Sequence, residues 1–112
     1  MLLALDIGNT NITFGVFGDN GDESRYVPSA TWRIATEADR MPDEYGLLLN
    51  QLLPAKGVAP DDLTSVALCS VVPPLTPAFV EVCEDYLKLE PLVVGAGTKT
   101  GIKVLYDNPR DV

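Results

Sequence analysis

The stretch that decides the fold is Leu2-Leu3-Ala4-Leu5-Asp6-Ile7-Gly8-Asn9-Thr10-Asn11-Ile12-Thr13-Phe14-Gly15-Val16-Phe17. Its first four residues are all apolar, which is typical of a strand that is covered on both faces. From Ile12 onward, apolar residues alternate with Thr13 and Gly15, and this period of two indicates a second strand. The stretch therefore predicts two strands around a tight polar turn, with Asp6 at the carboxyl end of the first.

Asp6 and the turn after it are the candidate chemical groups. An unpaired carboxylate behind four apolar residues is costly, so Asp6 needs a partner, and one candidate is a magnesium ion that carries phosphates. Gly8 lets the backbone approach a ligand closely. The amides and side chains of Asn9, Thr10 and Asn11 can donate to phosphate oxygens. The alternative is a hairpin in which the Asp and Asn side chains only satisfy the turn, since both residue types favour turns.

The segment from Asp6 to Gly15 resembles the first phosphate motif of the acetate and sugar kinase/actin superfamily, and its form D-x-G-N-T-N resembles that of type III pantothenate kinases. Two later segments support this resemblance. Ser70-Val71-Val72-Pro73 with Leu75-Thr76-Pro77 matches a recurring stretch of the family, although strand-proline-helix is also an ordinary junction. The segment from Tyr106 to Val112 matches Y-x-N-P-x-x-V, which in the family continues into G-A-D-R. The aspartate of G-A-D-R is the family's proposed general base, and here it would lie beyond Val112.

Composition limits the remaining classes of function. The 112 residues suggest one domain, and a hydrophobic content of 46% supports a core. Sixteen acidic and eight basic residues give a net charge of −8, which argues against nucleic acid as a partner. The chain has no histidine, so histidine metal sites and histidine acid–base chemistry are excluded. Because ATP and pantothenate are both anionic, the overall charge opposes them, and binding has to come from local donors and a metal ion.

Cysteine spacing and the N-terminus indicate the compartment. Cys69 and Cys83 lack C-x-x-C spacing and lie in apolar segments, so we expect buried free thiols. The short apolar run at the N-terminus follows no basic segment and is interrupted by Asp6, unlike a signal peptide. No run approaches the roughly 18 apolar residues of a membrane span. We therefore expect a soluble cytoplasmic protein without a membrane partner.

The rest of the chain predicts a third strand over about residues 25–34, in which Pro28 implies an edge position, a bulge or a later start. Trp32 is expected to face the core, and a base-stacking role is the alternative. A helix with an apolar stripe should begin at Pro42 and stop at Pro54. A buried strand is predicted over residues 65–72. After it come a helix with Thr76 as N-cap and Pro77 as first residue, and a short strand over residues 92–94.

Residues 95–101 lack the spacing of a P-loop and a following helix, so a connection is the better interpretation than a Walker-type phosphate site. The predicted order βββαβαβ fits an α/β domain of the ribonuclease H-like, or actin-like ATPase, type. Its mixed sheet would consist of a β-meander followed by parallel strands, which join through right-handed crossovers, and packing helices. The resemblance implies that residues 1–112 are the amino-terminal ATPase-type domain of a two-domain kinase.

The resemblance also implies a reaction, the ATP-dependent phosphorylation of pantothenate to 4'-phosphopantothenate, which is the first step of coenzyme A biosynthesis. Asp6 would orient Mg²⁺ and the transferring phosphate, while Gly8, Asn9, Thr10 and Asn11 would hold phosphate oxygens. Further implications are a role for Tyr106 in the pantothenate pocket, a monovalent cation (K⁺ or NH₄⁺) and a homodimer. The fragment alone would be inactive, since the base and the second domain are absent from it.

Two alternatives stay open on the residues alone. The chain could be a non-catalytic nucleotide-binding or regulatory domain of the same fold. The segment around Tyr106 could be only a polar turn before a helix, with Pro109 setting the start of that helix.

Overall fold

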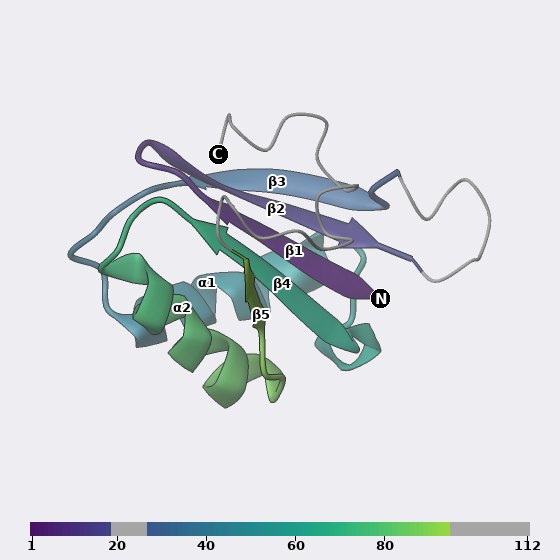
Figure 1. Cartoon of the computed structure of the whole chain (residues 1–112). Coiled ribbons are helices and arrows are strands. Elements are labelled where there is room, and N and C mark those ends of the chain that lie inside the picture. Colours follow the sequence, from purple (N-terminus) through teal and green to yellow (C-terminus); the bar gives the residue numbers. More distant parts are fainter. Residues whose placement is uncertain (19–26, 95–112) are drawn as a thin grey trace.

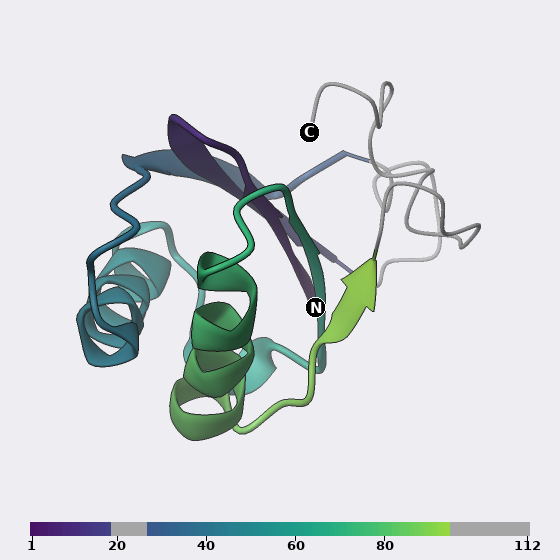
Figure 2. The ribbon, with the colours of Figure 1, turned by 60° about the vertical axis from the view of Figure 1, so that its left-hand side comes forward.

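The structure is a computed structural model, and it describes residues 1–18 and 27–94 of the chain. In this part of the chain a five-stranded mixed sheet carries two α-helices on one of its faces (Figures 1 and 2). The elements are, in chain order, β1 (Leu2–Ile7), β2 (Asn11–Phe17), β3 (Ala30–Ala35), α1 (Pro42–Ala55), the 3₁₀ helix η2 (Pro60–Asp62), β4 (Ser65–Ser70), α2 (Leu75–Val82), the π-helix η3 (Cys83–Leu87) and β5 (Leu92–Val94).

The strand order in the sheet is β3-β2-β1-β4-β5. β2 pairs antiparallel with both β1 and β3, whereas β4 pairs parallel with both β1 and β5. Only β2 therefore runs against the other described strands. The predicted meander followed by parallel strands is confirmed, and so is the predicted mixed α/β class.

The core lies between the sheet and the helices. Alternate residues of the strands point toward α1 and α2, as a period of two requires. The buried side chains on this face of the sheet are Leu3, Leu5, Ile7, Ile12, Phe14, Val16, Trp32, Val66 and Leu68. The helices contribute Tyr45, Leu49, Leu53, Leu75, Phe79, Val82, Cys83 and Leu87. The Trp32 ring stacks on Phe14 with 5.2 Å between centroids, so it belongs to the core and is not an exposed stacking platform.

Four predicted boundaries differ from the structure. β4 ends at Ser70, two residues before the predicted end at residue 72. β3 begins at Ala30, two residues after Pro28, which is the later start that the proline allowed. α1 continues through Pro54 to Ala55, because a proline lacks a donor but its carbonyl still accepts, here from Gly57 N at 2.9 Å. The prediction of Thr76 as the N-cap was wrong: α2 begins at Leu75, which is buried and whose N–H donates to Val72 O at 2.9 Å.

Helices α1 and η3 come into contact at a glycine, Gly46. Gly46 of α1 is buried, and a Cβ at this position would overlap with Cδ1 of the Tyr86 ring. The Tyr86 hydroxyl donates to Asp43 Oδ1 at 2.7 Å, which holds the ring against the helix. Because the ring lies over Gly46, the close approach of α1 and η3 depends on this glycine. Over residues 1–18 and 27–94, no helix has the length and apolar character needed to cross a membrane.

Candidate active site

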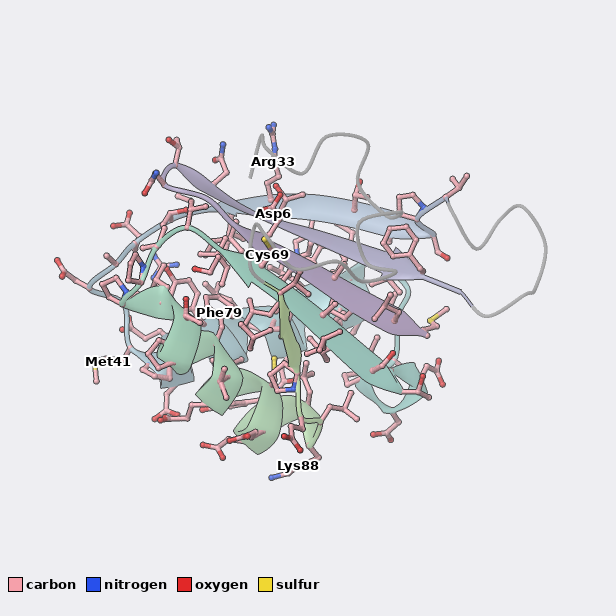
Figure 3. The ribbon with its side chains drawn as sticks, viewed as in Figure 1. Asp6, Arg33, Met41, Cys69, Phe79 and Lys88 are labelled. Carbon is pink, nitrogen blue, oxygen red and sulfur yellow. The ribbon has the colours of Figure 1, made fainter. Side chains whose placement is uncertain are left out.

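Asp6 lies on the face of the sheet that the helices leave uncovered. It stands between Leu5 and Ile7, which both point into the core, so its own side chain points the other way. The strand register places it opposite Thr13 of β2 on one side and Cys69 of β4 on the other. Thr13 is in turn opposite Arg33 of β3. The four side chains thus form one row across the sheet, and Figure 3 shows Asp6, Cys69 and Arg33 on the side away from α1 and α2.

The Asp6 carboxyl group is half-buried, and one of its oxygens has no partner within the described part of the chain. Oδ1 is buried and makes no hydrogen bond to any residue of the ranges 1–18 and 27–94, which the structure describes. Burial raises the pKa of Asp6 above its ordinary value, because a poorly hydrated carboxylate is disfavoured. A buried polar atom without a partner is uncommon and calls for an explanation. Trp32 Nε1, in the core, is also buried without a partner among the described residues, so this feature alone does not mark a site. At Asp6, a cation would supply the missing interaction.

The turn between β1 and β2 is closed by its own backbone. Gly8 N donates to Asn11 O at 3.0 Å, which leaves Asn9 and Thr10 at the tip. Asn9, Thr10 and Asn11 are all exposed. A Cβ at Gly8 would lie 3.1 Å from Asn11 O, so a larger residue would push the two strands apart. The turn therefore presents donors to solvent beside Asp6, at the carboxyl end of β1, where ligands of α/β sheets commonly bind.

The segment that follows β3 is hydrogen-bonded to this turn. The residue after β3 is Thr36, whose Oγ1 donates to Gly8 O at 2.7 Å and whose backbone N–H donates to Thr10 O at 2.9 Å. The strand β4 also reaches this end of the sheet, because Val71 N donates to Ile7 O at 3.0 Å. The turn is thus fixed from both neighbouring strands.

Five of the six predicted site residues come together at this end of the sheet: Asp6, Gly8, Asn9, Thr10 and Asn11. The sixth, Tyr106, lies outside the described residues. Sequence reasoning did not single out Thr36, Arg33 or Cys69. A threonine directly after a strand and an arginine within one carry no distinctive pattern, so no sequence signal identified them as neighbours of Asp6.

The residues present fit a magnesium ion that is bound mainly through phosphates. Mg²⁺ usually takes one or two carboxylates from the protein and keeps water and substrate phosphates as its other ligands. Over residues 1–18 and 27–94, no group of three or more Cys, Asp or Glu side chains could hold a metal by itself. Asp6 would then be the protein ligand, and its orphaned Oδ1 is the atom available for this role.

Both cysteines are free, as predicted, but they differ in surroundings. Cys83 is fully buried in the core, and this burial, with a smaller effect of the Glu84 charge, raises the pKa of its thiol to about 12. Cys69 is only half-buried, and burial together with the Asp6 charge raises the pKa of its thiol as well. Neither thiol is therefore activated as a nucleophile.

Comparison with known proteins identifies the family of the chain. A family model described as type III pantothenate kinase matches residues 2–112. The type III pantothenate kinase of Dehalococcoides mccartyi (strain ATCC BAA-2266 / KCTC 15142 / 195) is 50% identical over 111 residues, which are 99% of this chain and 41% of that relative. The chain thus spans less than half the length of the curated relative it matches. On this match, and in agreement with the motif around Asp6, the chain belongs to the type III pantothenate kinase family.

Proposed function

We propose that the complete gene product, meaning the protein encoded by the whole reading frame that contains this chain, phosphorylates pantothenate with ATP to give 4'-phosphopantothenate. This is the first step of coenzyme A biosynthesis. The observation that carries the proposal is the buried Oδ1 of Asp6, which has no partner among the described residues and lies beside a turn of exposed donors. Family membership supplies the substrate, since the matching relative is named a pantothenate kinase.

Phosphoryl transfer asks a protein mainly for positioning and for stabilisation of charge. Asp6 would hold Mg²⁺, which when bound neutralises phosphate charge in the transition state. Gly8, Asn9, Thr10 and Asn11 would bind phosphate oxygens through backbone amides and side chains. Arg33 lies in the same row as Asp6 and is the one Lys or Arg residue in the described strands, so it can supply positive charge to an anionic ligand on this face.

The described sheet also supports the proposed architecture. A β-meander whose first strand pairs in parallel with the next strand, with a helix in each crossover, is the arrangement expected of a ribonuclease H-like or actin-like ATPase domain. We propose that residues 1–112 belong to such an amino-terminal domain. The proposal further includes a role for Tyr106 in the pantothenate pocket, a monovalent cation (K⁺ or NH₄⁺), a homodimer and a cytoplasmic location, all of which come from the family resemblance.

The test is a phosphoryl-transfer assay on the purified complete gene product. With Mg²⁺ and ATP, pantothenate-dependent release of ADP and a product heavier by one phosphoryl group are expected. Residues 1–112 alone should give neither, because they do not include the G-A-D-R segment whose aspartate is the family's proposed base. A complete gene product that binds MgATP but releases no ADP with pantothenate would refute the proposal. That result would favour the alternative, a non-catalytic nucleotide-binding domain.

A further inference from the structure

Thr36 is the residue that ties the candidate phosphate-binding turn to the rest of the domain. Its side chain and its backbone each donate one hydrogen bond to the turn, to Gly8 O at 2.7 Å and to Thr10 O at 2.9 Å. Both acceptors are backbone carbonyls, and the Oγ1 bond is partly shielded from solvent. Hydrogen bonds to two carbonyls restrict the turn more than either bond alone, because they hold it at two points, Gly8 and the tip residue Thr10.

The segment that carries Thr36 is itself anchored in the core. The Tyr45 hydroxyl accepts a hydrogen bond from Glu37 N at 3.0 Å and donates one to Glu37 O at 2.7 Å. Tyr45 is 1% exposed, and its ring lies 4.6 Å from that of Phe79 between centroids. A continuous path of contacts therefore runs from the two helices, through residues 36 and 37, to the turn.

We infer that Thr36 is a positioning residue for nucleotide binding, which acts through the backbone of the turn and does not itself touch the ligand. The inference rests on the proposed function, in which this turn holds phosphate oxygens. Backbone amides bind phosphate well only when several point at it together. The proton of Oγ1 is already used in the bond to Gly8 O, so the hydroxyl is suited to fixing the turn and not to binding a phosphate.

The test compares two substitutions at this position in the complete gene product. Thr36→Val keeps the shape of the side chain and removes the donor, whereas Thr36→Ser keeps the donor. The matched control is Thr31→Val, the same change at an exposed position of β3. MgATP affinity, measured by calorimetry, and steady-state kinetics with ATP and pantothenate varied in turn are the two readouts.

A misplaced binding group commonly costs on the order of tenfold to a hundredfold. Thr36→Val should therefore weaken MgATP binding and raise KM for ATP by about this factor, with KM for pantothenate changed less than about threefold. Thr36→Ser and Thr31→Val should stay within about threefold of the wild type in both constants. If Thr36→Val does not fold, Tyr45→Phe is tested in its place, because this variant lacks the hydroxyl that anchors Glu37. We then expect a smaller loss of MgATP affinity and no change in KM for pantothenate.

The outcomes separate this inference from the proposed function. A wild type that binds MgATP without pantothenate turnover refutes the proposed reaction, while a selective loss of MgATP affinity in Thr36→Val still supports the inference. Unchanged MgATP affinity in Thr36→Val, or an equal loss in Thr31→Val, overturns the inference alone. A serine variant as weak as the valine variant also overturns it. A wild type that does not bind MgATP overturns both.

Discussion

Replacing Asp6 by asparagine is expected to lower turnover and to raise stability at neutral pH. The two effects have one cause. The carboxylate lies where a cation can bind it, but Oδ1 is buried and receives no hydrogen bond from the described residues. Asparagine keeps the size of the side chain and removes the charge. The variant therefore loses the interaction with the metal and also the cost of the poorly hydrated carboxylate.

The expected magnitudes follow from the position of the carboxyl group. Loss of one electrostatic contact to a reacting group typically costs roughly 10²–10³-fold in kcat, and we expect a loss of this order. A buried acceptor without a partner costs about 1–3 kcal/mol, and a charged one costs more. Asparagine leaves a neutral polar atom at the same place, so only the part due to the charge is recovered, about 1 kcal/mol for a half-buried group. This corresponds to a rise in Tm of about 2–4 °C for a protein of roughly 150–250 residues.

The difference in stability between Asp6→Asn and the wild type should depend on pH, and the direction follows from the pKa of Asp6. Burial raises the pKa of Asp6 in the folded state above 3.8. The folded state then holds the proton more tightly than the unfolded state, so stability falls as pH rises from 3.8 through the folded pKa. The variant lacks this loss. Its advantage in Tm should be present at pH 7 and should shrink as pH falls toward 4.

The assay combines steady-state kinetics of the complete gene product at saturating Mg²⁺ and ATP with Tm measured across this pH range. Asp39→Asn is the control, because Asp39 is exposed and the change in net charge is the same. It should alter stability by less than about 0.5 kcal/mol. Near-normal turnover of Asp6→Asn would remove Asp6 from the site. A fall in Tm at pH 7 would show that the carboxylate is paired in the native protein and would refute the reasoning.

Three further substitutions test other parts of the account. Gly46→Ala should destabilise the protein by about 1–3 kcal/mol in thermal unfolding, because the new methyl group meets the Tyr86 ring. Adding Tyr86→Ala should recover part of this loss. If the stability changes of the two single variants simply add up in the double variant, the contact is contradicted. Arg33→Gln should weaken MgATP binding most at low salt, where charges are least screened, whereas Arg40→Gln, on the helix side, should not; equal effects would remove Arg33 from the site. Tyr106→Ala should raise KM for pantothenate much more than KM for ATP. The expected loss in kcat/KM for pantothenate is about 2–4 kcal/mol, or roughly thirtyfold to a thousandfold. A change in KM for ATP alone would assign Tyr106 to the nucleotide side.

Local patterns were sufficient for the type of most elements but not for all of their ends. The alternation after Ile12 and the apolar stripe of α1 predicted a strand and a helix because each pattern reflects the period of its own element. The ends depend on single hydrogen bonds in the adjoining turns. Leu75 N bonds to Val72 O, and this starts α2 earlier than Thr76 suggested.

The sequence by itself determined that Asp6 needs a partner and that donors follow it, because a charge after an apolar run and a polar turn are both local features. Only the tertiary structure decided which residues stand around Asp6. Cys69 and Arg33 reach its row through strand pairing across the sheet, and Thr36 reaches the turn because the chain returns to it after β3. Such neighbours are set by the register and packing of segments far apart in the chain, where one residue of slip would turn every side chain to the other face.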